Sequence, residues 1–351
     1  MSDPAIANTS ASPDRSLAAR LVQLIGQSLP DARDVSVESI APMFGGNARK
    51  AWSLDLVFQL DGSPQRLACV MLSQGADRQI ETDVAQEFRV LHGLNGKGTR
   101  APAAVAMDAR GEIVGAPTIV LERLPGKASA VDFLNSPDPA VARRLTEDLA
   151  SVVADLHAVD WTPAAFDPVL EGLSPREVAL RQIVHWHDTF LAQRLEPMPV
   201  MSGLFGWLYR HLPEPQRICL VHGDLRPGNF LYEGDRVSGL LDWEMAHLGD
   251  PVEDLAWIYR PLWSPERFVP LREFVQRYAE LGGREIAWSD ILYYRVFNEL
   301  KFAVISLTAA RAFITSGTPN MRHADRAATV PPGLKRCLAW VELHSKETSR
   351  V

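Results

Sequence analysis

Residues 218–251 read ICLVHGDLRPGNFLYEGDRVSGLLDWEMAHLGDP, and this stretch decides the fold. It contains three short apolar runs, ICLV, NFLY and VSGLL, which are typical of strands. His222, Asp224 and Asn229 lie on one loop between the first two runs. Asp242 directly follows the third run. We therefore expect two carboxylates and one amide oxygen to lie close together.

This set of side chains fits phosphoryl transfer. A carboxylate and an amide carbonyl are hard oxygen ligands of the kind that Mg²⁺ binds, with water and phosphates completing its shell. Asn229 and Asp242 are therefore the predicted metal ligands. Asp224, five residues before Asn229, is then free to accept a proton from an attacking hydroxyl. The alternative is a solvated loop whose carboxylates only cap turns.

The patterns on either side of this stretch predict an α+β, two-lobed fold. Residues 16–125 combine helical patterns with short strand-like runs, including a hairpin around Asp61–Gly62, and predict a lobe with a small antiparallel sheet. Pro125–Gly126 ends the last of these runs. Residues 126–351 are mainly helical and predict the second lobe. Residues 1–15, rich in small and polar residues, predict a disordered tail.

Composition excludes several classes of protein. The chain has 351 residues, 46% of them hydrophobic and 23% charged, which is ordinary for a globular protein. Its net charge of -7 disfavours nucleic-acid binding. Three widely spaced cysteines predict no disulfide framework, and no run of residues is apolar enough to predict a membrane span. We expect a cytoplasmic protein.

Two segments, VHGDLRPGNFLY (221–232) and LLDWEMAHLGDPVEDLAW (240–257), resemble the aminoglycoside phosphotransferase family, a branch of the protein-kinase-like fold. The kinase catalytic loop spaces its Asp and Asn as Asp224 and Asn229 are spaced, and Asp242 matches the later metal-binding Asp. The resemblance extends over most of residues 16–260. It is nearest to the subset linked to acyl-CoA dehydrogenases, some of which are kinases of hydroxyacyl-CoA.

Three more segments match the family in order, and they imply a site for ATP with Mg²⁺. They are similar to the phosphate-loop hairpin, the C helix and the hinge, in GGNARKAWSLDL (45–56), AQEFRVL (85–91) and APTIVLERLPG (116–126). The resemblance implies that His222 orders the catalytic loop, that Arg226 meets a phosphate or solvent, and that the acceptor is a small-molecule hydroxyl. The implied nucleotide-binding residues are Gly45, Gly46, Asn47, Arg49, Glu87, Glu122 and Leu124.

One position departs from the family pattern. The family has a Lys or Arg on the third strand, where it reaches the phosphates and pairs with the C-helix Glu. Here Val70 or Met71 occupies that place. Arg49, Lys50 and Arg66 are the candidate substitutes. Loss of this contact would remove transition-state stabilisation, so a kinase-like nucleotide-binding protein with weak or no transfer activity is an alternative.

The acceptor and the reaction leave further alternatives. Residues 284–351 contain 10 basic and 6 acidic residues, whereas a pocket for a polycationic aminoglycoside should be acidic. We therefore expect a neutral or anionic acceptor, such as a hydroxyacyl-CoA, unless these charges only face water. A metal-dependent phosphohydrolase would use the same carboxylates with water in place of an acceptor.

Overall fold

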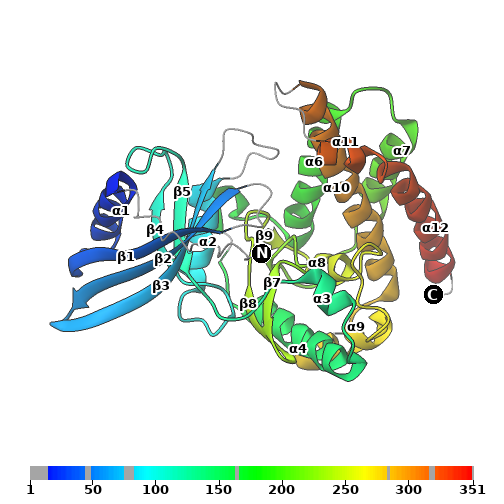
Figure 1. Cartoon of the computed structure of the whole chain (residues 1–351). Helices are drawn as coiled ribbons and strands as arrows, with labels where there is room; N and C mark the ends of the chain where they lie inside the picture. The colour runs from blue at the N-terminus through cyan, green and yellow to red at the C-terminus, as the bar shows by residue number, and fades with distance from the viewer. Residues whose placement is uncertain are drawn as a thin grey trace, which may run out of the picture. The chain divides into compact units, whose positions relative to one another are not determined.

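The computed structural model describes residues 15–43, 49–74, 83–162, 166–282, 285–315 and 321–349. The chain divides into two compact units, which are described separately (Figure 1). Asp83–Phe88 and Ala103–Arg123 join the N-terminal residues in the first unit. Arg89–Pro102 and the chain from Leu124 form the second.

The first unit contains an antiparallel sheet of five described strands in the order β1-β2-β3-β5-β4. The tight turn between β2 and β3 uses Asp61 and Gly62, with φ of 51° and 74°. Two positive φ values suit a two-residue hairpin, and Gly adopts this conformation without strain. The predicted hairpin is therefore confirmed. The strands are β1 (Arg33–Met43), β2 (Arg49–Leu60), β3 (Ser63–Gln74), β4 (Ala104–Asp108) and β5 (Thr118–Glu122).

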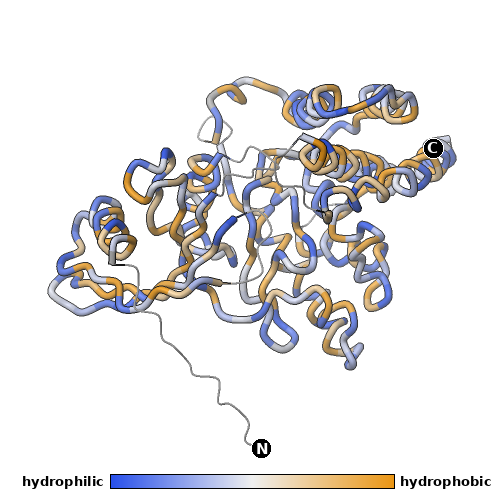
Figure 2. The backbone as a smooth tube through the Cα atoms, turned by 45° about the horizontal axis from the view of Figure 1, so that its top comes forward, coloured by the Kyte–Doolittle hydropathy of each residue, from blue (hydrophilic) through white to orange (hydrophobic). Residues whose placement is uncertain are grey.

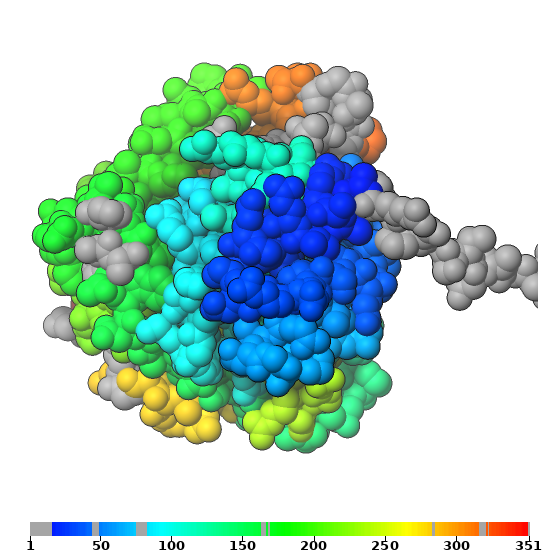
Figure 3. Space-filling model, turned by 90° about the vertical axis from the view of Figure 1, so that its left-hand side faces the viewer, coloured from blue at the N-terminus to red at the C-terminus, as the bar shows by residue number. Residues whose placement is uncertain are grey.

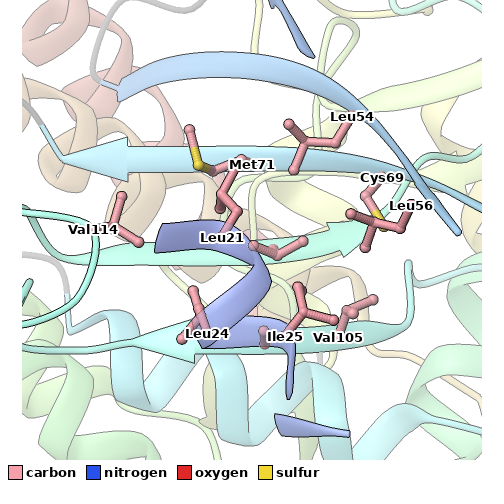
Figure 4. Packing of buried hydrophobic residues seen from close by; sticks show 11 residues of the cluster. Leu21, Leu24, Ile25, Leu54, Leu56, Cys69, Met71, Val105 and Val114 are labelled. Carbon is pink, nitrogen blue, oxygen red and sulfur yellow. The ribbon is translucent and has the colours of Figure 1, made fainter. Parts of the chain in front are cut away.

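Helix α1 (Arg15–Ser28) closes the core on one face of this sheet. In Figure 3 it lies in dark blue at the surface of the unit, beside the strands in lighter blue. Leu21, Leu24 and Ile25 point from α1 toward the buried side chains of the strands (Figure 4). Met71 is one of these buried side chains, with 1% exposure. Because strand side chains alternate, Val70 lies on the opposite face.

The segment Arg89–Pro102 belongs to the second unit, whereas the sequence had placed it in the first lobe. It includes the end of α2 (Val84–Leu94). Arg100 explains the difference, since its guanidinium donates to Asp148 Oδ2 at 2.7 Å and to the carbonyl of Val237. These bonds tie the segment to the second unit.

Helices dominate the second unit, and hydrophobic and hydrophilic stretches alternate along them (Figure 2). None of the described helices is long and apolar enough to cross a membrane. The helices are α3 (Ala130–Leu134), α4 (Pro139–Ala158), α6 (Pro175–Gln193), α7 (Pro199–His211), α8 (Val252–Ile258), α9 (Leu271–Gly282), α10 (Trp288–Thr315), α11 (Met321–Ala327) and α12 (Val330–Thr348), with a 3-10 turn at Pro168–Leu170.

The central stretch forms two small antiparallel pairs, and its three apolar runs supply three of the four strands, as predicted. In one pair β6 (Cys219–Val221) bonds to β9 (His247–Gly249). In the other β7 (Phe230–Glu233) bonds to β8 (Arg236–Leu240). The sequence pattern did not predict β9, which is only three residues long.

The three cysteines are free thiols and all are buried. Cys69 lies in the first unit, and Cys219 and Cys337 lie in the second. Burial raises the pKa of Cys69 to about 12 and raises that of Cys337 as well.

Candidate active site

The loop of residues 222–229, between β6 and β7, is anchored by a buried carboxylate on α8. Asp254 accepts the backbone N–H of His222 at 2.8 Å and that of Gly223 at 2.9 Å. His157 lies 3.1 Å from the same carboxylate. Burial alone would raise the pKa of Asp254, but these partners hold it at about 2. The anchor is therefore a charged carboxylate at neutral pH.

Gly223 is required by this geometry. Its φ is +80°, and a Cβ at this position would lie 2.5 Å from the carbonyl oxygen of Met245. Real side chains do not come this close to a backbone atom, and the positive φ already disfavours them. The glycine thus lets the 222–229 loop lie against the segment that follows Asp242.

Asp224 is held by two donors, one on each carboxylate oxygen. Trp257 of α8 donates its indole N–H to Oδ1 at 3.0 Å. The amide nitrogen of Asn229 donates to Oδ2 at 2.7 Å. Arg226 places its Nε 3.3 Å from Oδ1. With its side chain 14% exposed, Asp224 is fixed in orientation and still reachable.

His222 links the loop to the segment that carries Asp242. Its Nδ1 accepts the backbone N–H of Asp224 at 3.3 Å, and its Nε2 lies 3.0 Å from the carbonyl oxygen of Leu241. This network requires the neutral ring with the proton on Nε2. Burial lowers the pKa of His222, which favours the same neutral form. These bonds occupy both ring nitrogens, so the ring is suited to ordering the loop.

Asn229 and Asp242 have the donor chemistry that Mg²⁺ requires. The backbone N–H of Leu241 donates to the carbonyl of Asn229 at 2.8 Å, which places Asp242 beside this residue. Both side-chain bonds of Asn229 use its nitrogen, so its Oδ1 remains an acceptor. Asp242 is exposed, with φ of 67°. An amide oxygen and a carboxylate fit a magnesium ion that also binds phosphates.

A buried cation also supports the 222–229 loop, by a bond to a backbone carbonyl. Lys301 of α10 donates to the carbonyl of Gly223 at 2.6 Å and to Glu253 at 2.9 Å. Its side chain is only 1% exposed. Burial alone would raise the pKa of Glu253, but Lys301 and His247 hold it below the ordinary value. The loop therefore has charged anchors at both its N–H groups and its carbonyl.

Two arginines lie close to Asp224 and face no further carboxylate among the described residues. Arg226 stacks over Trp263, with 5.8 Å from Cζ to the ring centroid. Arg326 of α11 has no ion pair in the described part of the chain. Burial lowers the pKa of Arg326, the charge of Arg226 lowers it further, and Asp224 opposes them. Two guanidinium groups therefore lie close to the carboxylate of Asp224.

The first unit supplies one of the proposed substitutes for the family's third-strand cation. Arg49 forms a 2.6 Å ion pair with Glu87 of α2, and the two side chains are 9% and 2% exposed. Arg66 pairs instead with Glu38 at the surface, and Lys50 is exposed. Strand alternation puts Arg49 on the sheet face of Val70. Arg49 is thus the candidate that meets the helix glutamate.

The other nucleotide-binding candidates are backbone groups. Gly45, Gly46 and Asn47 lie outside the described residues. The N–H of Glu122 donates to the carbonyl of Ala103 at 2.9 Å, and its carboxylate accepts the N–H of the same residue at 3.3 Å. Leu124 begins the chain's second unit.

Sequence reasoning missed Trp257, Lys301, Arg326 and Arg123. Trp257 is the last residue of the matched segment 240–257 and could have been recognised as an indole donor. Lys301 stands in the apolar run of α10, and a lone charge at a core position is a usable signal. Arg123 donates to Ser53 and, at 3.0 Å, to Asp55 on the face of Val70.

Comparison with known proteins agrees with this geometry. The model of the phosphotransferase enzyme family (APH) matches residues 52–289. Mouse acyl-CoA dehydrogenase family member 10 is 29% identical over 194 residues, which are 54% of this chain and 18% of that protein. Viomycin phosphotransferase of Streptomyces vinaceus is 30% identical over 184 residues, or 50% of this chain and 60% of that enzyme.

Solved structures share the fold. A provisionally assigned aminoglycoside phosphotransferase from Ralstonia eutropha has a TM-score of 0.69 at 21% identity, covering 93% of this chain and 98% of that one. The aminoglycoside phosphotransferase APH(4)-Ia, in complex with AMP-PNP and hygromycin B, has a TM-score of 0.58 at 18% identity and the same coverage. The chain spans about a fifth of its first curated relatives. It belongs to the phosphotransferase enzyme family and has the kinase-like α+β fold.

Proposed function

We propose that this protein transfers the γ-phosphate of ATP to a hydroxyl group of a small anionic molecule, with Mg²⁺. The carrying observation is the arrangement at Asp224. Trp257 and Asn229 fix its carboxylate, and the backbone bond from Leu241 to Asn229 places Asp242 beside Asn229. Positioning and electrostatic stabilisation supply most of the catalysis in phosphoryl transfer, and this arrangement provides both.

In the proposed reaction Asp224 orients the acceptor and takes its proton. The hydroxyl oxygen forms a bond to the γ-phosphorus, the bond from that phosphorus to the β-bridging oxygen breaks, and ADP leaves. Asp224 accepts the hydroxyl proton on a carboxylate oxygen. Asn229 and Asp242 would hold Mg²⁺, which neutralises charge on the phosphates when it is bound.

At the nucleotide, we assign the role of the third-strand cation to Arg49. Its buried ion pair with Glu87 has the partners of the kinase Lys–Glu pair, although Arg49 comes from the preceding strand. The backbone of Gly45, Gly46 and Asn47 is proposed to cover the phosphates. The backbone from Glu122 to Leu124 is proposed to hold the adenine.

The acceptor is proposed to carry negative charge. Arg226 and Arg326 near Asp224 favour an anionic group, and they disfavour a polycationic aminoglycoside. Several curated relatives are named as acyl-CoA dehydrogenase family members. The coenzyme A ester of a hydroxy acid is therefore the acceptor class to test first.

One observation favours a second function, nucleotide binding without efficient transfer. The third strand carries no cation at the family position, because Met71 is buried in the core under α1 and Val70 is apolar. If Arg49 does not reach the phosphates, catalysis would lose a large part of its stabilisation.

Thermal unfolding with Mg-ATP tests the nucleotide site without an acceptor. ATP at 100 times its dissociation constant should stabilise the wild type by about 2.7 kcal/mol. Asp242→Ala should lose this stabilisation, whereas Asp155→Ala, at an exposed position of α4, should keep it. A loss in both variants, or no stabilisation of the wild type, would contradict the proposed site.

Transfer assays then test the reaction. We expect phosphorylation of a hydroxyacyl-CoA, and a decrease in kcat of at least about 100-fold in Asp224→Asn with Mg-ATP binding retained. Faster turnover with kanamycin would overturn the anionic acceptor. Release of free phosphate without any acceptor would favour the phosphohydrolase. Binding of ATP with no transfer to any hydroxyl compound would favour the second function.

A further inference from the structure

A second basic cavity lies in the helical unit. It has a volume of about 600 Å³ and is formed by the loop after α8, the start of α9 and the first half of α10. No residue of the 222–229 loop lines it, so it is distinct from the site at Asp224. Its lining residues include Tyr259, Ser264, Glu266, Arg267, Arg272, Trp288 and Arg295.

Three arginines that line this cavity stack on aromatic rings. The guanidinium carbon of Arg272 lies 3.9 Å from the ring centroid of Trp288. Arg267 lies 4.3 Å from the ring of Phe268. Arg295 lies 4.4 Å from the ring of Trp340. Stacking restricts these side chains, which lowers the entropy lost when they bind a ligand.

Negative charge in the cavity does not balance the arginines. None of the three forms an ion pair or a side-chain hydrogen bond with another residue that the structure describes. Arg295 also has a buried Nε without a partner. Glu266 is the only carboxylate in the lining, and its Oε2 accepts the N–H of Leu271 at 3.3 Å. The N–H groups of three guanidinium groups are therefore available to an anion.

We propose that this cavity binds a phosphorylated small molecule at a site separate from phosphate transfer. Guanidinium groups pair with phosphate through two parallel N–H bonds, and three of them match a group with two or more negative charges. A carboxylate carries one charge and needs only one such partner. A pyrophosphate tail and a phosphate monoester share this chemistry, and the experiment distinguishes them.

Calorimetric titration of the full chain in metal-free buffer of low ionic strength tests this site. The probes are sodium pyrophosphate and glycerol 3-phosphate. We expect one site for at least one probe, with affinity unchanged in Asp242→Ala and about tenfold weaker in Arg272→Gln. Arg267→Gln should show a similar loss. Both arginines are exposed, so their replacement should not disturb folding.

Arg277→Gln is the matched control, because Arg277 is an exposed arginine of the same helix that pairs with Glu280 outside the cavity. Full affinity in this variant, together with the loss in Arg272→Gln, supports the site. Tighter binding of pyrophosphate identifies a nucleotide-like tail, and tighter binding of glycerol 3-phosphate a monoester. Equal losses in Arg272→Gln and in the control Arg277→Gln would overturn the proposal, as would a loss in Asp242→Ala. No binding of either probe at concentrations up to about 10 mM would overturn it as well.

Discussion

Lys301 is a charged residue whose removal should affect the whole fold. It is buried, and its ammonium group joins the carbonyl of Gly223 to the carboxylate of Glu253. It also lies over the ring of Trp257, 4.7 Å from the centroid. Removing one partner of a buried ion pair leaves the other charge buried without compensation. This destabilises the fold more than replacing both partners with apolar residues does.

We therefore expect Lys301→Met to lower the free energy of unfolding by about 3 kcal/mol. The double variant Lys301→Met with Glu253→Gln should recover part of this loss, because it removes the stranded carboxylate. Urea unfolding at pH 7 measures both. A single variant within about 0.5 kcal/mol of wild type would show that the pair contributes nothing to stability.

Trp257 acts on Asp224 through a single indole N–H. Trp257→Phe keeps an aromatic ring in the core and removes only this donor. We expect kcat to fall about tenfold, since the carboxylate loses one of the two bonds that orient it, while the affinity for Mg-ATP stays constant. Trp207→Phe, in a different part of the helical unit, should leave kcat unchanged. Equal kcat in Trp257→Phe and wild type would exclude this positioning role.

At the scale of elements, the short helix α8 organises the catalytic loop. Glu253, Asp254 and Trp257 come from this one helix, and each contacts either the 222–229 loop or the lysine that holds it. Asp254 stands in the first turn of this helix and anchors the loop. Its bonds to two consecutive N–H groups explain why a carboxylate is needed there.

The low pKa of Asp254 predicts how stability depends on pH. Its ordinary value is 3.8 and its folded value is about 2, so the charged form stabilises the fold above pH 3.8 and this contribution is lost as the pH falls through about 2. The difference corresponds to about 2 kcal/mol. The free energies of unfolding of wild type and Asp254→Asn, measured by urea unfolding, should converge by this amount between pH 5 and pH 2. A constant difference would rule out the charged anchor, with Asp155→Asn as the exposed control.

Helix α1 contributes its own share of stability to the first unit. Leu24 is 1% exposed and packs against the sheet (Figure 4). Leu24→Ala should therefore cost about 2 to 5 kcal/mol, from lost burial and the cavity left behind. Gln27→Ala, at an exposed position of the same helix, should cost less than about 0.5 kcal/mol. Chemical denaturation compares the two, and equal values would mean that α1 is not part of the cooperative core.

The fold was largely predictable because its signals are local. The turn at Asp61–Gly62, the apolar runs of the central stretch and the periodic helices each follow from a few adjacent residues. Helix bounds are less predictable: α9 begins only at Leu271, because Pro270 directly before it cannot donate a backbone hydrogen bond to a preceding helical turn.

The residues of the candidate site were also predictable only where the signal is local. Asp224 and Asn229 are five residues apart, so their spacing alone placed them together. Lys301 and Arg326 reach the same loop from distant parts of the sequence, and only packing brings them there. The substitute for the third-strand cation also needed the register of β2 and β3, since the face that Arg49 occupies depends on which residues pair.

At the scale of the whole molecule, charge is unevenly distributed. The chain carries a net charge of -7, while residues 284–351 contain four more basic than acidic residues. The basic residues of this segment should therefore attract an anionic acceptor, and salt should weaken this attraction by screening the charges. We expect its KM to rise at least about threefold between 50 and 300 mM NaCl, with kcat nearly constant. A KM that falls with salt would point to a cationic acceptor.

Because both units contain a buried thiol, the rate at which these thiols react can measure how often each unit unfolds locally. A thiol reacts with a disulfide reagent only as the thiolate and only when reached by solvent, and the raised pKa of Cys69 adds to its protection. Cys69 is in the first unit, whereas Cys219 and Cys337 are in the second. Mass spectrometry of the natural chain during slow thiol labelling would therefore time the two units separately. Nucleotide should slow the reaction of Cys69 if it is held by the unit that contains Arg49.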